Sequence, residues 1–168
     1  LFLYNERTRP IMSAFKYQNK RILADFFNWE LCQHRLSQLK SFGVTAVVPV
    51  PIHKNKYKKR GYNQASLLSS RLALTLNLSH YPDMLIRSID TLPQKQFSPQ
   101  ARLTNLKKAF CLNPRYNNLL SDNPSLSILL VDDIYTSGAT MEACTRILLE
   151  SGVAEVYILS ICIGVSRD

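Results

Sequence analysis

Apolar residues recur at helical spacing in three segments of the first half of the chain. Pro10 is placed to open a short helix. A longer amphipathic helix is predicted over about 22–40, with Gly43 positioned to stop it. Asn63 is placed to begin a third helix that continues to about residue 76.

Short apolar runs predict three buried β-strands, at 44–48, 128–131 and 156–163. A helix over about 140–150 stands between the last two runs. Strand, helix and strand in this order form a βαβ unit, in which the two strands are parallel. The predicted fold class is therefore α/β, with a central, mostly parallel sheet flanked by helices.

The remaining segments are expected to be loops within one domain, because 168 residues suffice for a single well-filled core. Residues 52–61 are expected to form a strongly basic loop, and 113–127 a polar connector. The stretch 86–110 has mixed polarity and is expected to be a long exposed excursion, a kind of loop that often serves as a lid.

The most informative stretch follows the second apolar run, where Asp132 and Asp133 precede a turn of small residues. In an open α/β sheet, ligands bind beyond the carboxyl ends of the strands, so both carboxylates are expected at a site. Hydroxyls, backbone N–H groups and a helix N-terminus together favour a phosphate. Carboxylates beside such a turn suit the vicinal hydroxyls of a sugar phosphate. The predicted phosphate-binding residues are Thr136, Ser137, Gly138, Ala139 and Thr140.

The same stretch has two other interpretations. Four apolar residues followed by two aspartates also resemble a Walker B strand, but the chain has no G-x-x-x-x-G-K-[ST] loop to accompany it. A plain strand end with Thr140 as a helix N-cap is the structural alternative. The turn that directly follows the aspartates favours the ligand site.

Charge is distributed unevenly along the chain, whose net charge is +9. Residues 1–110 hold 18 basic and 5 acidic side chains, and residues 111–168 hold 3 and 7. The cationic part predicts an anionic partner, which composition alone does not distinguish among nucleic acid, phosphates and a membrane surface. Because the predicted basic loop leaves the end of a strand, it is expected to share the ligand face with Asp132, and Lys58, Lys59 and Arg60 are candidates for binding nucleic acid.

The cysteines point to a reducing compartment. Cys32, Cys111, Cys144 and Cys162 have no metal-ligand spacing and stand among apolar neighbours, so buried free thiols and a cytoplasmic location are expected. No apolar run approaches the roughly 20 residues that span a bilayer.

The acidic pair and its turn resemble the signature of type I phosphoribosyltransferases. That resemblance implies that Asp132 and Asp133 hold the ribose of 5-phosphoribosyl-1-pyrophosphate (PRPP), with Mg²⁺ held through the ligand, and that residues 136–140 hold its 5′-phosphate. The family also has a pyrophosphate loop after such a strand as 44–48, so the resemblance implies that Arg60 and Gly61 bind the diphosphate. Purine-salvage members have an acid–base Asp where Thr136 stands, so base transfer by that route is not expected here.

Further residues resemble the ComF/GntX branch of this family. Its V-P-V-P…R-G-[FY]-N-Q pattern matches Pro49-Val50-Pro51 and residues 60–64, and Lys16-Tyr17 resembles an early Lys-[FY]. The branch also has an R…T…Q…R…N…AF series, matched here by Arg87, Thr91, Gln94, Arg102, Asn105, Ala109 and Phe110.

The resemblance implies a bacterial protein of natural competence and DNA uptake, with a mobile hood over the ligand at about 87–110. Lys95 and Arg102 are the hood cations expected to close over the diphosphate. Many relatives carry an N-terminal zinc-binding segment; the sequence begins with Leu1, so that segment was either removed or never present, and no zinc is expected.

Three functions follow from these observations. The first is a PRPP- and Mg²⁺-binding competence protein that also contacts single-stranded DNA. The second is an active phosphoribosyltransferase of nucleotide salvage or biosynthesis, and the third is a DNA-binding module with a vestigial pocket. The sequence does not identify a catalytic base or an acceptor.

Overall fold

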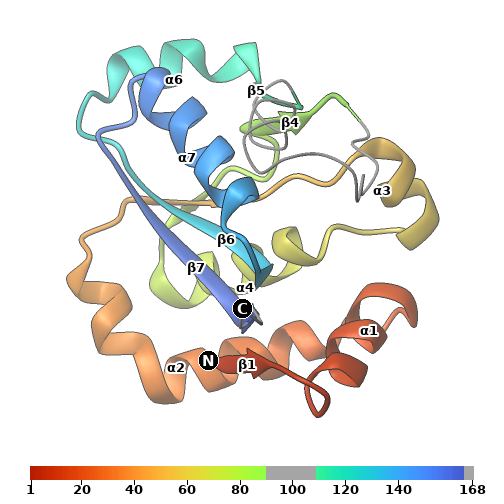
Figure 1. Cartoon of the computed structure of the whole chain (residues 1–168). Helices are drawn as coiled ribbons and strands as arrows, with labels where there is room; N and C mark the ends of the chain where they lie inside the picture. Colours follow the sequence, from red (N-terminus) through yellow and green to blue (C-terminus); the bar gives the residue numbers. More distant parts are fainter. Residues whose placement is uncertain (90–108, 165–168) are drawn as a thin grey trace.

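The computed structural model describes residues 1–89 and 109–164, arranged as strands and helices around one main sheet (Figure 1). In chain order the elements are β1 (Phe2–Tyr4), α1 (Arg9–Tyr17), α2 (Leu23–Ser41), β2 (Ala46–Pro49), α3 (Lys54–Arg60), α4 (Gln64–Leu76), β3 (Ser79–His80), β4 (Leu85–Arg87), β5 (Phe110–Leu112), the 3₁₀ turn η1 (Pro114–Tyr116), α6 (Asn117–Asp122), β6 (Ser127–Tyr135), α7 (Ala139–Glu150) and β7 (Glu155–Gly164).

The main sheet has five strands in the order β1-β7-β6-β2-β3. All of its neighbouring strands run parallel. β6 lies in the middle, where Leu129 pairs with Val47 of β2 and with Tyr157 of β7. The carboxyl ends of β2, β6 and β7 therefore meet at one edge, and the predicted α/β class with a mostly parallel sheet is confirmed.

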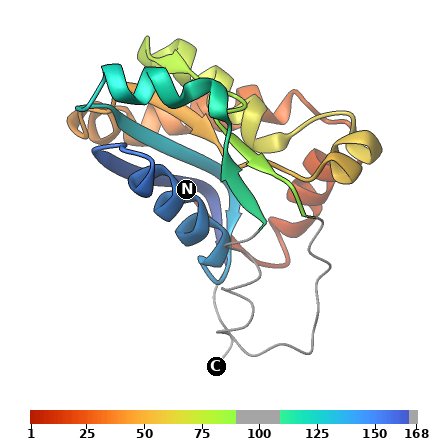
Figure 2. The same cartoon turned by 90° about the horizontal axis from the view of Figure 1, so that it is seen from above.

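Helices cover both faces of this sheet because side chains of a strand point alternately to opposite sides. Ile128 and Leu130 pack in a cluster with α7, α6 and the β4–β5 pair, and Leu129 and Val131 pack in a second cluster with α1, α2 and α4. Figures 1 and 2 show α7 on the side of β6 and β7 opposite to α1 and α2. Every residue of β2 is buried, as expected for a strand covered on both faces.

The basic segment 52–61 is mostly a helix, and its prediction as a loop was wrong. α3 occupies Lys54–Arg60 and is held at both ends. At its start the His53 Nδ1 accepts a hydrogen bond from the Asn55 backbone N–H at 3.2 Å. At its end Gly61, with φ +78°, adopts the left-handed conformation that closes many helices. These two caps stabilise a short helix despite its repelling cations.

The predicted excursion 86–110 begins and ends in a paired stem. β4 and β5 are antiparallel, with Arg87 opposite Phe110, and the Arg87 guanidinium lies 5.0 Å from the centre of the Phe110 ring. The hood cations Lys95 and Arg102 lie outside the described residues.

Some short elements were not predicted from the sequence. The segment 113–127, expected to be a polar connector, contains η1 and α6, whose Tyr116 and Leu120 are buried in the core. β1 was also missed because its three residues form a strand only by pairing with β7. Within the described ranges, no helix has the length and apolar character needed to cross a membrane.

Candidate functional site

The two predicted ribose-binding aspartates lie at the carboxyl end of β6, in the middle of the sheet. Asp132 pairs with Ser160 of β7, and Asp133 is almost fully buried. The turn that follows carries Thr136 and Ser137, both exposed, into α7. The strand therefore brings the acidic pair and the predicted phosphate turn together at the ligand-binding edge of the sheet.

The turn leaves the first N–H groups of α7 without a side-chain cap. Gly138 is the N-cap residue, with φ +76°, and as a glycine it has no side chain to cap the helix start. Thr140, considered above as a possible N-cap, lies inside the helix. The positive φ of Gly138 favours glycine for its backbone conformation, and a Cβ there would also displace the hydroxyl end of the Tyr135 side chain. Uncapped N–H groups at the positive end of a helix are suited to a phosphate.

The two carboxyl groups of the pair differ in their surroundings. Burial, together with the nearby charge of Asp133, raises the pKa of Asp132 to about 7. The Asp133 backbone N–H donates to Asp132 Oδ1 at 2.8 Å. This hydrogen bond lowers the pKa of Asp132, but burial and the charge of Asp133 raise it by more. Asp133 has its own counterion, because its Oδ2 lies 3.0 Å from Lys16 Nζ at the end of α1. The carboxyl oxygens of the pair are acceptors suited to the hydroxyls of a diol.

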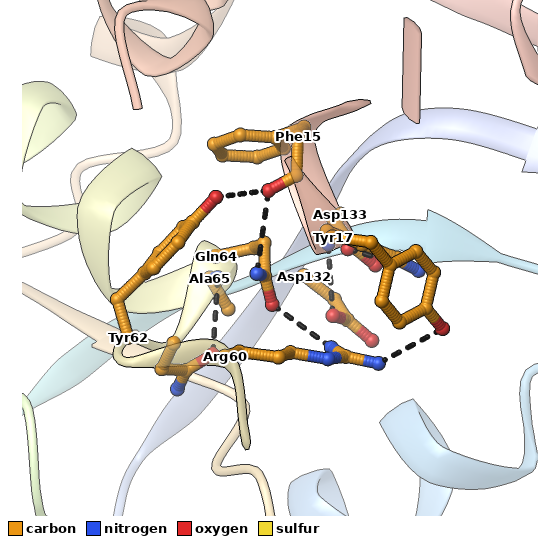
Figure 3. A network of polar contacts seen from close by, with 10 residues as sticks. Phe15, Tyr17, Arg60, Tyr62, Gln64, Ala65, Asp132 and Asp133 are labelled. Carbon is orange, nitrogen blue, oxygen red and sulfur yellow. Dashed lines mark hydrogen bonds and ion pairs between the residues drawn. The ribbon is translucent and has the colours of Figure 1, made fainter. Parts of the chain in front are cut away.

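Arg60 reaches the same region from the end of α3 (Figure 3). Its Nη1 donates to Gln64 Oε1 at 3.0 Å, and its Nη2 donates to the Tyr17 hydroxyl at 3.2 Å. Its guanidinium also lies over the Tyr17 ring, 4.9 Å from the ring centre. Because Lys16 contacts Asp133 and the next residue contacts Arg60, the end of α1 connects the acidic pair to the basic segment.

The turn after Arg60 is attached to the end of β2 and to α1. The Asn63 side chain donates to the Val50 carbonyl at 2.9 Å and accepts from the Ala65 N–H at 3.2 Å, which caps α4. The Tyr62 hydroxyl donates to the Phe15 carbonyl. This second attachment holds the last turn of α1 against the 60–64 segment.

No protein-family model matches the sequence, but curated relatives do. The chain is 32% identical over 160 residues to Competence protein F of Haemophilus influenzae, covering 92% of this chain and 67% of that protein. The chain belongs to the ComF family. It is also 29% identical to Competence protein ComFC of Bacillus subtilis, covering 92% of this chain and 58% of that protein, and 31% identical to the DNA utilization protein YhgH of Salmonella typhi, covering 90% and 65%. This ComF-family chain thus spans about two thirds or less of these relatives.

A solved structure shows the same fold. Glutamine phosphoribosylpyrophosphate (PRPP) amidotransferase of Bacillus subtilis, solved with ADP and GMP, matches with a TM-score of 0.56 over 89% of this chain and 30% of that one, at 14% identity. At that identity the likeness concerns the fold alone. Together with the parallel sheet it shows that the ComF-family chain has the type I phosphoribosyltransferase fold.

The structure adds residues that the sequence did not assign to the site. Lys16 and Tyr17 were noted only as part of a family pattern, and Gln64 only as part of the R-G-[FY]-N-Q series. Their roles depend on the packing of α1 against α4 and β6, which leaves no local signal in the sequence. The nucleic-acid candidates Lys58 and Lys59 are exposed on α3 and lie outside the network of Arg60.

The cysteines only partly match their prediction. Cys144 and Cys162 are buried, Cys32 is partly exposed, and Cys111 is exposed because β5 is part of a two-stranded sheet with one open face. In the part of the chain that the structure describes, no three His, Cys, Asp or Glu side chains are grouped closely enough to hold a metal ion.

Proposed function

We propose that this ComF-family chain is a cytoplasmic protein that binds PRPP together with Mg²⁺ and acts in natural competence and DNA uptake. The observation that carries the proposal is the placement of Asp132 and Asp133 directly before the uncapped start of α7. The names of the relatives, Competence protein F and ComFC, support the biological role.

Each part of PRPP corresponds to a part of the site. The two hydroxyls of the ribose meet the acidic pair, and the 5′-phosphate meets the N–H groups and hydroxyls of residues 136–140. The diphosphate points toward Arg60, since the end of β2 lies beside that of β6. Arg60 uses only two of its five N–H donors in the contacts described above, so it has donors left for phosphate oxygens.

The donors of the site fit Mg²⁺, which prefers oxygen ligands and usually retains waters and substrate phosphates in its shell. Asp132 and Asp133 supply carboxyl oxygens on the ribose side, and the ligand supplies the remaining ones. When bound, the ion neutralises phosphate charge and so strengthens the binding of the diphosphate. A metal held mainly through the ligand requires no three-residue cluster in the protein.

Binding rather than transfer is the activity that the turn favours. Thr136 stands where purine-salvage members have an acid–base Asp, and its hydroxyl cannot exchange a proton with a base near neutral pH. The proposal therefore does not include a nucleobase transfer step. Contact with single-stranded DNA is part of it, because α3 presents the exposed cations Lys58 and Lys59 in the same short helix that ends at Arg60.

Isothermal titration calorimetry with PRPP tests the proposal. We expect saturable binding in the presence of Mg²⁺, and a loss of at least roughly 30-fold in affinity for Asp132→Asn/Asp133→Asn, since hydrogen bonds to charged groups contribute about 1.5–3 kcal/mol each. Asp122→Asn, which changes an exposed acid on α6, is the matched control and should bind as the wild type does. Equal affinity of wild type and double variant would show that the site is assigned wrongly.

A further inference from the structure

Tyr17 is the most exposed aromatic side chain in the described ranges, at 63%. It is the last residue of α1 and directly follows Lys16, which contacts Asp133. Large aromatic surface is normally buried during folding, because its exposure to water is unfavourable. A ring left open beside a cluster of charged groups is a candidate binding surface.

The ring is held in place although it is exposed. Arg60 covers it at 4.9 Å from the ring centre and donates to its hydroxyl at 3.2 Å. Arg60 is itself held by Gln64, whose side chain is 1% exposed and also donates to the Phe15 carbonyl at 3.4 Å. A ring whose orientation is already fixed loses little conformational entropy when it binds a ligand.

Two further cations follow Tyr17 closely in the chain. Lys20 and Arg21 are exposed in the turn that follows α1, and the Arg21 guanidinium lies 4.8 Å from the centre of the Tyr62 ring. Figure 3 shows Tyr17, Arg60 and the two aspartates of the site together. A flat aromatic group flanked by cations matches a ligand that combines a planar ring with phosphates.

We propose that the Tyr17–Arg60 pair is a stacking surface for a nucleobase, with the adjoining cations contacting the attached phosphate. The base lies against the open part of the Tyr17 ring, and Arg60 supports the ring from its other side. Every nucleobase has a face that stacks on an aromatic ring, so this surface is expected to accept different bases. The inference deepens the proposed function by naming the group that binds beside the PRPP site.

A nucleobase can arrive on a free nucleotide or in a single strand of DNA, and the test separates these sources. The probes are thymidine monophosphate, an oligothymidylate of about eight nucleotides, which is within the usual range of single-strand site sizes, and an abasic deoxyribose-phosphate oligomer of the same length. The abasic oligomer has the same phosphates without bases. Affinities for the labelled oligomers are measured by fluorescence anisotropy, and that for the nucleotide by calorimetry.

Three variants isolate the contribution of stacking. Tyr17→Leu removes the ring, and Tyr17→Phe keeps the ring but removes the hydroxyl that Arg60 contacts. Trp29→Leu removes an aromatic side chain of similar exposure, 56%, from α2 and serves as the matched control. Circular dichroism and urea unfolding establish that each variant is folded.

We expect Tyr17→Leu to bind oligothymidylate roughly 5-fold or more weakly than the wild type, as the loss of one base-stacking contact predicts, and to bind the abasic oligomer unchanged. Tyr17→Phe and Trp29→Leu should bind oligothymidylate within about 2-fold of the wild type. If Tyr17→Leu also loses affinity for thymidine monophosphate, the free nucleotide is a source of the base. If the affinity loss is confined to the oligomer, the source is single-stranded DNA.

The inference is overturned if Tyr17→Leu binds oligothymidylate as the wild type does, or if it loses the same factor with the abasic oligomer. These measurements contain no PRPP. Failure of the stacking surface is therefore distinguishable from failure of the PRPP site, which is tested separately with Asp132→Asn/Asp133→Asn.

Discussion

At the scale of single residues, the ion pair between Lys16 and Asp133 is the contact that joins α1 to the acidic end of β6. Its side chains are only 20% and 10% exposed, so the pair is largely protected from solvent screening. Asp132 and Asp133 could be predicted as site residues because motif and strand are contiguous. Lys16 is far from them in the chain. Its contact with Asp133 depends on how α1 packs, which the spacing of residues in the sequence does not reveal.

Loss of the Lys16 ammonium should destabilise the fold. Lys16→Met leaves the buried Asp133 carboxylate without its counterion, and we expect the free energy of unfolding to fall by about 1–3 kcal/mol. Urea unfolding at neutral pH measures this change. Arg71→Met breaks the exposed Arg71–Asp25 pair and is the control, with an expected change below about 0.5 kcal/mol. Equal effects of both variants would mean that the buried pair contributes no more than a surface pair.

The raised pKa of Asp132 should appear in the pH dependence of stability. The pKa is about 7 in the folded protein and about 3.9 in an unfolded chain, so the folded state holds more protons between these values. The stabilising contribution of Asp132 is therefore complete below about pH 4 and is lost as pH rises through about 7. The unfolding free energy of the wild type minus that of Asp132→Asn should therefore fall as pH rises over this range.

Urea unfolding of both proteins at several pH values between about 5 and 8 measures that difference. Burial lowers the pKa of His80, which changes stability in the opposite direction, but His80 is present in both proteins and cancels. A difference that stays constant with pH would contradict the raised pKa of Asp132.

At the scale of elements, the turn between β6 and α7 depends on the conformation of one glycine. Gly138 has φ +76°, which lets the chain pass from the end of β6 into α7 beside the Tyr135 side chain. The sequence allowed this turn to be predicted because its small residues directly follow an apolar strand. It did not reveal that Tyr135 occupies the space next to Gly138.

We expect Gly138→Ala to be more destabilising than Gly43→Ala. Both positions have positive φ, which costs a residue with a Cβ roughly 1–2 kcal/mol. A Cβ at Gly43 meets nothing within 4 Å, whereas one at Gly138 overlaps Tyr135. Urea unfolding compares the two variants, and Gly138→Ala/Tyr135→Ala should recover the part of the loss caused by overlap. No recovery in the double variant would exclude steric overlap as the cause.

The helix α3 shows why a basic segment can be predicted as a loop although it forms a helix. Clustered lysines repel one another, and this favoured a loop. The helix forms because His53 and Gly61 cap its two ends, and of these Gly61 was a recognisable stop signal in the sequence. The capping role of His53 could not be recognised beforehand, because histidine is not among the usual N-cap residues.

At the scale of the whole molecule, oppositely charged side chains from separate parts of the chain come together at one edge of the sheet. The acidic pair lies on the central strand, and Lys16 and Arg60 approach it from α1 and α3. The fold class was predictable because the apolar runs are long and regular. The contact between the ends of α1 and α3 was not predictable, because it depends on tertiary packing.

Binding of single-stranded DNA should depend steeply on salt. Neutralised phosphates release counterions, at about 0.7 per contact for a single strand. Lys58→Gln/Lys59→Gln should weaken binding of oligothymidylate and reduce the slope of log affinity against log salt by roughly 1.4. Arg35→Gln/Lys40→Gln removes two exposed charges from α2 and should leave the slope unchanged. Affinity that does not vary with salt would refute electrostatic binding along α3.

The attachment of the α1 end to the segment 60–64 has a consequence for protein engineering. The Phe15 carbonyl accepts hydrogen bonds from Tyr62 and Gln64, and Tyr17 supports Arg60. A chimera that receives only 60–64 from this chain would place Arg60, Tyr62 and Gln64 against an α1 end whose position is set by the packing of another parent. Residues 15–17 and 60–64 must therefore be transplanted together, and exchanges between family members should be tolerated when both segments come from the same parent.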